Sequence, residues 1–405
     1  MTDQHPPTLL LTFTGTDQPG VTDSLLQAIA PEDVHVLDLE QAVVRGRLTL
    51  SALTSATDHP DRVIAAAEEV AARWSLDLQI EPGSGDNPKR RTGRASVVVI
   101  GAPLHAAPLA RLTSRIVLSG ANIDRIRRLS REPVTTLELD LSGADVPALR
   151  RDLALVAAEQ GLDIAVAPGG LDRRGRRLLV MDVDSTLIRD EVIELLARHA
   201  GREAEVAAVT ERAMRGEIDF EQSLHERVRA LAGLPESVLH EVRDAVRLTP
   251  GARTLVRTVK RLGFSVAVVS GGFIEIVGPL AAELGIDHAH ANRLEIRDGR
   301  LTGRVDGPVV DRAEKARALA RFADLEHLPL SRTVAIGDGA NDLDMLASAG
   351  LGIAFNAKPM VREQADASVN VPYLDPVLFM LGISREDVVN ADLEDENLAE
   401  AGGLV

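Results

Sequence analysis

Residues 176–385 consist of short apolar segments that alternate with stretches of helical periodicity, and this alternation restricts the fold more than any other feature. Strands that are buried on both faces read as continuous apolar runs, and the helices between them supply the crossovers of a parallel sheet. The pattern therefore predicts an α/β fold. In such a sheet, ligands bind beyond the carboxyl ends of the strands, so the residues that follow each apolar run are candidates for chemistry.

The first apolar run, Arg177–Met181, is followed by Asp182-Val183-Asp184. Two carboxylates at positions i and i+2 of an extended chain point the same way, so one can act as a nucleophile and the other as an acid or base. A turn or a helix cap is the simpler explanation of such a pair taken alone. An EF-hand is excluded, because the sixth position of that calcium loop requires Gly and here holds Leu187.

Two later apolar runs also end in polar clusters. The run 264–269 leads into Ser270-Gly271-Gly272, whose hydroxyl and backbone N–H groups suit an anionic oxygen, although a Gly-rich turn has the same composition. The run 332–336 leads into the segment 337–342, which contains Asp338, Asn341 and Asp342. Their oxygens suit Mg²⁺, and an Asx turn that caps a helix is the alternative.

Lys315 is a further candidate. Asp311 and Glu314 fit a capping box, which places Lys315 in the first turns of a helix. The chain has only four lysines, so a Lys at the mouth of a helix indicates a need for a compact ammonium group. Drift in composition is the alternative explanation.

Residues 1–168 contain one order of elements twice. Each unit reads strand, helix, two strands, helix and strand, which is the βαββαβ order of a ferredoxin-like fold. We place the units at residues 1–84 and 95–168. Segments rich in Gly, Pro and charge, residues 81–94 and 167–177, mark the linkers after them.

The first unit carries Asp17-Gln18-Pro19-Gly20 between its first strand and first helix. Gly lets the backbone close around a ligand at a helix N-terminus, and a plain turn before a helix is the alternative. With this loop the paired units resemble tandem ACT domains. The resemblance implies an amino-acid effector at Asp17 and Gly20, and a homodimer. The second unit has the different segment 101–105 at this place, so ligand binding there stays open.

The four clusters of residues 176–385, in this order, resemble the haloacid-dehalogenase superfamily, and their form is closest to its phosphoserine phosphatases. With the ACT-like units in front, the chain resembles the long bacterial form of that family. The resemblance implies a Rossmann-like core at 176–390 with a small helical cap at about 190–250. The acidic composition of residues 391–405 indicates a solvated tail after it. It also implies Mg²⁺-dependent hydrolysis of O-phospho-L-serine through an aspartyl-phosphate, the last step of serine biosynthesis.

The same resemblance implies a role for each cluster. Asp182 attacks phosphorus, and Asp184 protonates the departing oxygen and then activates water. Mg²⁺ is held by the Asp182 carboxylate, the Asp184 backbone carbonyl and Asp338, while Asp342 orients Lys315 or a metal-bound water. The remaining residues of the phosphoryl site are Ser270, the Gly271 N–H group and Asn341. With Lys315, they stabilise the negative charge on the phosphoryl oxygens.

Four residues of the expected cap match substrate positions of the family: Glu191, Met214, Phe220 and Arg227. Glu191 faces the substrate ammonium, Arg227 binds its carboxylate as a bidentate fork, and the other two cover it. Cap core is the alternative for Met214 and Phe220, and a surface charge is the alternative for Glu191 and Arg227. An unpaired buried carboxylate is costly, so Glu191 favours a free amino acid over a phosphoprotein as substrate.

Composition and the absence of other motifs limit the remaining classes. Lys+Arg total 45 against 61 Asp+Glu, a net charge of −16, which argues against a binder of nucleic acid or membrane surfaces. The chain has no Cys, so disulfides, thiolate zinc sites and thiol nucleophiles are excluded. We find no signal peptide and no apolar run of the roughly 18 residues that a membrane helix needs, and we expect a soluble, cytoplasmic protein.

Two other functions stay open. The core could act on another small phosphate ester, or the chain could be an amino-acid sensor with a silent phosphatase core. His288 and His290 form an H-x-H pair without a further ligand nearby, so we expect structural histidines there.

Overall fold

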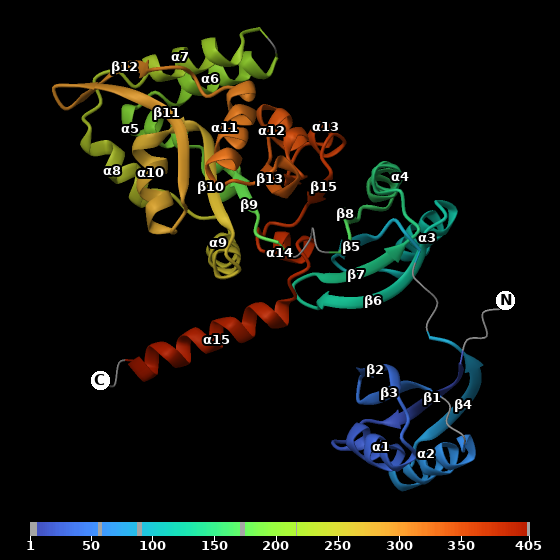
Figure 1. The fold of residues 1–405 in the computed structure, drawn as a ribbon. Coiled ribbons are helices and arrows are strands. Elements are labelled where there is room, and N and C mark those ends of the chain that lie inside the picture. The colour runs from blue at the N-terminus through green and yellow to red at the C-terminus, as the bar shows by residue number, and fades with distance from the viewer. Residues whose placement is uncertain (1–5, 56–58, 87–90, 171–174, 216, 403–405) are drawn as a thin grey trace. The chain divides into compact units, whose positions relative to one another are not determined.

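The computed structural model of the chain describes residues 6–55, 59–86, 91–170, 175–215 and 217–402, without the side chains of Met214 and of residues 394–402. The chain forms two compact units, residues 1–90 and 91–405. The first unit contains one sheet and the second contains two (Figure 1). Over the described residues, no helix combines the length and the apolar character needed to cross a membrane.

The first unit is a four-stranded antiparallel sheet in the order β2-β3-β1-β4, with both helices packed on one face. Its elements are β1 (Pro7–Thr16), α1 (Val21–Ile29), β2 (Val36–Val44), β3 (Arg47–Ser55), α2 (Pro60–Trp74) and β4 (Asp77–Ser84). Alternate residues of β1, among them Leu11 and Phe13, are buried against the helices. The predicted βαββαβ order is confirmed.

The linker expected to begin at residue 81 begins later, because β4 continues to Ser84. Glu81 and Pro82 pair with Leu10 and Leu9 of β1. β4 is an edge strand, where a Pro costs no hydrogen bond of the sheet interior. Composition marked these residues as loop, whereas their pairing with β1 makes them strand.

The second unit begins with another βαββαβ sheet, in the order β6-β7-β5-β8. Its elements are β5 (Ala95–Gly101), α3 (Ala106–Leu118), β6 (Asn122–Ser130), β7 (Thr135–Ser142), α4 (Val146–Gln160) and β8 (Asp163–Pro168). All residues of β5 are buried. Val97 and Val99 face the unit's own helices, whereas Val98 and Ile100 join the apolar core of the domain that follows.

That following domain contains a seven-stranded sheet in the order β12-β11-β10-β9-β13-β14-β15. All neighbours are parallel except β11 and β12. The strands are β9 (Leu178–Met181), β10 (Ser265–Phe273), β11 (His288–Arg297), β12 (Arg300–Asp306), β13 (Thr333–Gly337), β14 (Leu351–Phe355) and β15 (Ala367–Val369). The predicted parallel α/β sheet is confirmed.

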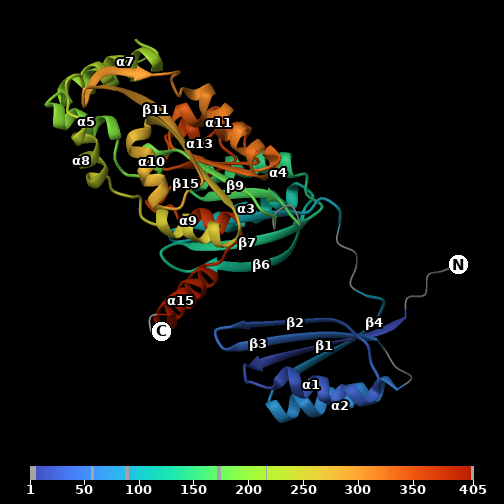
Figure 2. The ribbon, with the colours of Figure 1, turned by 60° about the vertical axis from the view of Figure 1, so that its left-hand side comes forward.

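Helices cover both faces of this sheet, and Figure 2 shows α10 and α11 on its two sides. One face packs against α11 (Arg312–Leu325) and α12 (Leu343–Ser348), and the other against α9 (Ala252–Arg261), α10 (Ile274–Glu283) and α14 (Pro376–Met380). α13 (Pro359–Arg362) follows β14. The last helix, α15 (Arg385–Gly402), passes through residue 391, so the tail expected from that position is the continuation of a helix.

The helices between β9 and β10 form a cap over the sheet: α5 (Val192–Ala200), α6 (Glu203–Met214), α7 (Phe220–Arg229) and α8 (Ser237–Ala245). The β11–β12 hairpin holds this cap through backbone hydrogen bonds. Gly233 N donates to Leu301 O over 2.8 Å, and Leu301 N donates to Leu234 O over 2.9 Å. The cap is therefore attached to the core by the hairpin as well as by the chain that enters and leaves it.

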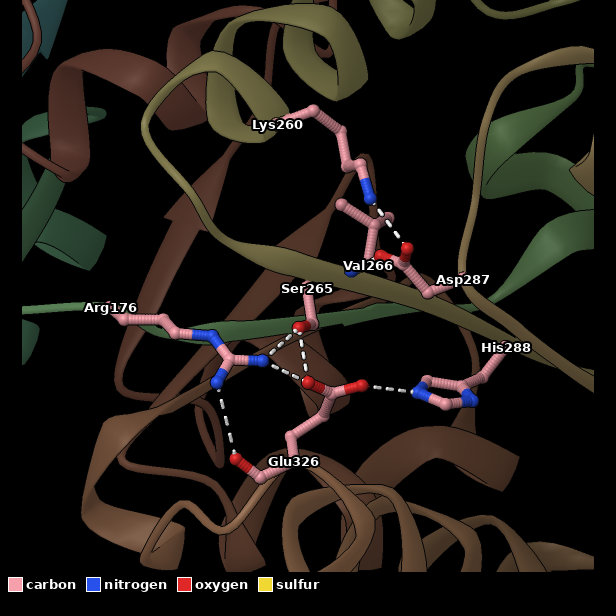
Figure 3. Close-up of polar contacts among 7 residues, drawn as sticks. All are labelled: Arg176, Lys260, Ser265, Val266, Asp287, His288 and Glu326. Carbon is pink, nitrogen blue, oxygen red and sulfur yellow. Dashed lines mark hydrogen bonds and ion pairs between the residues drawn. The ribbon is translucent and has the colours of Figure 1, made fainter.

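The amino ends of β9, β10 and β11 are joined by a polar cluster (Figure 3). Glu326 accepts a hydrogen bond from Ser265 Oγ over 2.6 Å and contacts His288 Nε2 over 2.6 Å and Arg176. The His288 ring stacks on Phe322, with ring centroids 5.1 Å apart. His288 thus belongs to a cluster at the sheet edge opposite the strand ends predicted to carry chemistry.

Candidate active site

The predicted polar clusters meet beyond the carboxyl ends of β9, β10 and β13, which are neighbours in the sheet. They form one wall of a cavity of about 450 Å³, and the cap forms the other wall. The predicted residues that line it from the core are Asp182, Asp184, Gly271, Asp338 and Asn341. Those that line it from the cap side are Glu191, Phe220 and Arg227.

Asp182 and Lys315 form a buried ion pair at the end of β9. Lys315 Nζ donates to Asp182 Oδ1 over 2.7 Å and to Asp342 Oδ1 over 2.6 Å. Burial raises the pKa of Asp182 well above its usual value, and the Asp342 carboxylate raises it further. Burial alone would lower the pKa of Lys315, but these two carboxylates raise it. Lys315 therefore remains a cation, fixed against the candidate nucleophile.

Three carboxylates of this region can hold a metal ion. Asp182, Asp338 and Asp342 each offer an oxygen, and these oxygens lie within 4.8 Å of one another. Burial, with Asp342 nearby, raises the pKa of Asp338 to about 6. Three acidic groups against the single ammonium of Lys315 leave an excess of negative charge, which fits a hard divalent cation with oxygen ligands. The side chain of Asp342 thus lies within the cluster, with its Oδ1 bonded to Lys315.

The Asp184 carboxylate is held by two hydrogen bonds. Its Oδ1 accepts from Val192 N over 2.8 Å, and its Oδ2 accepts from Ser270 Oγ over 2.9 Å. Burial raises the pKa of Asp184, and these bonds oppose the shift. A buried carboxyl group with a raised pKa, beside the candidate nucleophile, is suited to donate a proton.

The Ser270–Gly272 segment lies near the end of β10, where the pairing with β11 shifts, and we call it the Ser270–Gly272 loop. Ser270 Oγ accepts a hydrogen bond from Gly272 N over 2.7 Å. A Cβ atom on Gly272 would lie 2.8 Å from Asp184 Oδ2, so only Gly allows this approach. A Cβ on Gly271 would lie 3.2 Å from the Phe220 ring, which places that ring directly over the loop.

Glu191 and Arg227 bring opposite charges to the cap side of the cavity. Glu191 accepts a hydrogen bond from Ser185 Oγ over 2.8 Å, and burial, followed by the Asp184 charge, raises the pKa of Glu191 to about 7. Arg227 and Phe220 lie on α7, seven residues apart, and both line the cavity. A carboxylate and a guanidinium are the complements of an amino acid's ammonium and carboxylate. The side chain of Met214 lies outside the described residues.

Sequence reasoning assigned no role to Lys358, which lines the cavity from the loop between β14 and α13. The available signal was the rarity of lysine in this chain. The second histidine of the H-x-H pair, His290, contacts Glu314 Oε1 over 3.1 Å and does not line the cavity among the described residues.

The predicted effector residues belong to the first unit. Asp17 and Gly20 lie in the exposed loop between β1 and α1, where Gly20 has a φ of 100° and precedes the helix. Asp17 N donates to Gly46 O over 2.9 Å. The corresponding loop of the second sheet is filled by Leu104, whose Cα would lie 2.9 Å from a Cβ on Gly101.

Comparison with family models finds three matches along the chain. Residues 179–347 match the haloacid dehalogenase-like hydrolases. Residues 7–81 and 94–167 each match an ACT domain. The three matches follow the three sheets in order.

Two relatives match this chain over nearly its whole length. The chain is 57% identical to the phosphoserine phosphatase of Streptomyces coelicolor, over 98% of this chain and 97% of that protein. It is 50% identical to the phosphoserine phosphatase of Mycobacterium tuberculosis, over 96% of each. Among solved structures, a HAD family hydrolase of Salmonella enterica serovar Typhi is similar with a TM-score of 0.62 and 31% identity, covering 71% of this chain and 98% of that one.

Proposed function

Because this chain belongs to the phosphoserine phosphatases of the haloacid dehalogenase-like hydrolases, in the form that carries two ACT domains, we propose that it hydrolyses O-phospho-L-serine to L-serine and phosphate. The single observation that carries the proposal is one cavity lined by Asp182 on its core side and by Glu191 and Arg227 on its cap side, with Asp182 paired to the buried Lys315. The first pair suits a phosphoryl group and the second suits a free amino acid.

In the first step, a carboxylate oxygen of Asp182 attacks phosphorus, and the bond from phosphorus to the serine oxygen breaks. Asp184 gives its proton to that oxygen as it leaves. Lys315, Ser270 and the Gly271 N–H group stabilise the charge on the phosphoryl oxygens. L-serine is released, and Asp182 carries the phosphoryl group.

In the second step, Asp184 is a carboxylate and takes a proton from a water molecule that attacks the same phosphorus atom. The bond from phosphorus to Asp182 breaks, which returns Asp182 to its carboxylate form and releases phosphate. The hydrogen bond from Val192 N to Asp184 Oδ1 keeps Asp184 in place for both transfers, while the Ser270 hydroxyl is free to turn to the phosphoryl group.

Asp182, Asp338 and the backbone carbonyl of Asp184 would hold Mg²⁺, with Asp342 beside them. The bound cation would reduce the repulsion between the carboxylate nucleophile and the phosphate dianion. Lys315 carries out part of this screening itself, since it contacts Asp182 and Asp342 directly.

We further propose that the ACT domains bind an amino-acid effector, through Asp17 and Gly20 of the first one, and that the protein is a homodimer. The support is the match of residues 7–81 to the ACT family and the open loop before α1. L-serine, as the end product, is the effector that we expect, and we expect it to lower activity.

Phosphate release from O-phospho-L-serine and from its N-acetyl derivative, measured side by side with Mg²⁺, tests the proposed substrate. We expect a strong preference for the free amino acid, because acetylation removes the ammonium that Glu191 would face and leaves a buried carboxylate unpaired. Equal rates would contradict the role of Glu191. Turnover of neither compound would reject the proposed substrate.

A further inference from the structure

Asn292, on β11, is buried to 1% exposure, and nothing in the reaction described above uses it. We propose that Asn292 is a positioning residue of the active site, which fixes the Ser270–Gly272 loop against the start of the helix that carries Lys315. The inference rests on the proposed function of that loop. Asn292 itself is not among the described residues that line the cavity.

One arm of the Asn292 amide holds the loop. The pairing of β10 with β11 is regular up to Ser270 and Ala291 and then shifts, so that the next partners are Phe273 and Asn292. Gly271 and Gly272 therefore lie outside the regular ladder. Asn292 Nδ2 donates to the Gly271 carbonyl over 2.8 Å and supplies this group with a partner.

This hydrogen bond fixes a whole peptide plane. The Gly271 carbonyl and the Gly272 N–H belong to one rigid peptide unit. Asn292 binds the first, and Ser270 Oγ binds the second over 2.7 Å. Two consecutive Gly residues have wide conformational freedom, so an unheld plane could rotate. Rotation would break the bond from Gly272 N to Ser270 Oγ and disturb the bond from Ser270 to Asp184. It would also free the neighbouring peptide unit, which carries the Gly271 N–H that we propose as a phosphoryl ligand.

The other arm holds the helix start. Asn292 Oδ1 accepts a hydrogen bond from Val310 N over 2.8 Å. Val310 directly precedes Asp311, whose Oδ1 caps α11 by accepting from Glu314 N over 2.7 Å. Lys315 N in turn donates to Asp311 O over 3.0 Å. The Asn292 side chain is thus bonded both to the segment that carries the Gly271 N–H and to the residue before the cap of α11. The Gly271 N–H and the Lys315 ammonium are two groups that we propose to stabilise charge on the phosphoryl oxygens.

A purely structural role for Asn292 predicts lower stability without a specific effect on chemistry. Thr333 offers a matched control, because it is also 1% exposed and also makes one donated and one accepted hydrogen bond. Its Oγ1 donates to Leu330 O over 2.8 Å and accepts from Gly350 N over 3.3 Å. Thr333 is the first residue of β13, at the opposite end of the sheet from the cavity.

The experiment compares Asn292→Ala and Thr333→Ala in the full chain for kcat, KM, inhibition by inorganic phosphate and thermal stability. Both variants should melt earlier than the unchanged protein. Only Asn292→Ala should lose about 10- to 100-fold in kcat and bind phosphate about tenfold more weakly, because misplaced donors act on the phosphoryl group. KM for O-phospho-L-serine should change less than kcat, since Glu191 and Arg227 are untouched.

Asn292→Asp provides a second variant of the same size if Asn292→Ala does not fold. It keeps the acceptor for Val310 N and loses the donor to the Gly271 carbonyl, so it should show the same loss in kcat. The inference is overturned if a folded Asn292 variant keeps kcat within threefold of the unchanged protein, or if Thr333→Ala loses as much. p-Nitrophenyl phosphate serves as a second substrate, so failure of the proposed substrate can be told apart from failure of this inference.

Discussion

Lys315 and Lys260 show how burial changes the contribution of a lysine–aspartate ion pair to the free energy of unfolding. Lys315 is fully buried between Asp182 and Asp342, whereas Lys260 pairs with Asp287 over 2.5 Å with about a third of each side chain exposed. Removal of a buried partner leaves uncompensated charge, so we expect Lys315→Met to lower the free energy of unfolding by about 3–5 kcal/mol and to abolish phosphatase activity. Lys260→Met should cost at most about 1 kcal/mol and leave activity intact. Urea unfolding and phosphate release measure both, and equal losses would refute the assignment.

Glu191 should give the reaction a dependence on pH. Its pKa is raised to about 7, so in the free enzyme the carboxylate is ionised above that pH and becomes neutral below it. We expect KM for O-phospho-L-serine to rise as the pH falls below about 7, because the substrate ammonium then meets a neutral group. Glu191→Gln should have a high KM throughout and should lack this rise. The phosphate of the substrate also titrates, with a pKa near 6. Its effect on KM is the same in both proteins, so the Glu191→Gln profile is the control that isolates the contribution of Glu191. Identical profiles for the two proteins would show that Glu191 does not bind the ammonium.

At the scale of elements, the site residues that follow the predicted strands could be predicted from the sequence. The residues that adjacent strands bring to the same site could not. Asp182, Ser270 and Asp338 each follow an apolar run, and a parallel sheet brings such ends to one edge. Asn292 and Lys358 follow no such rule. Asn292 lies near the site because β11 is beside β10, and Lys358 because β14 is beside β13. The spacing of the motifs does not predict this order of strands. The position of Asp342 within the carboxylate cluster likewise depends on the turn of its loop.

The second ACT domain shows a signal that sequence reasoning did not use. Residues 97–100 of β5 are a continuous apolar run, although a sheet with one exposed face should alternate. The structure explains the run, because Val98 and Ile100 pack into the core of the phosphatase domain. Polar contacts support the same interface: Asp163 accepts from Asn370 N over 2.8 Å, and Arg150 pairs with Asp366 over 2.7 Å. The domain order could be predicted, and this interface could not, since its partner surface lies about 200 residues away in the chain.

At the scale of the whole molecule, control by L-serine requires separation of two sites, because serine is also the proposed product. Serine at the catalytic cavity would compete with substrate and would depend on Arg227, whereas serine at the ACT loop would depend on Asp17. We expect L-serine to bind the full chain and lower its rate, and Asp17→Ala to remove only the noncompetitive part of this inhibition. Asp61→Ala offers a control, because Asp61 is exposed in the first turn of α2 in the same unit.

Two measurements with L-serine, titration calorimetry and inhibition kinetics, show at which site serine acts. Both are made on the unchanged protein and on the two variants. The Asp61→Ala protein should match the unchanged one. The Asp17→Ala protein should bind serine at least about fivefold more weakly at the ACT site, because a polar contact with the ligand would be lost. Purely competitive inhibition in all three proteins would mean that serine acts at the catalytic cavity alone. The loop before α1 would then be a turn and a helix start, the alternative that its sequence allows.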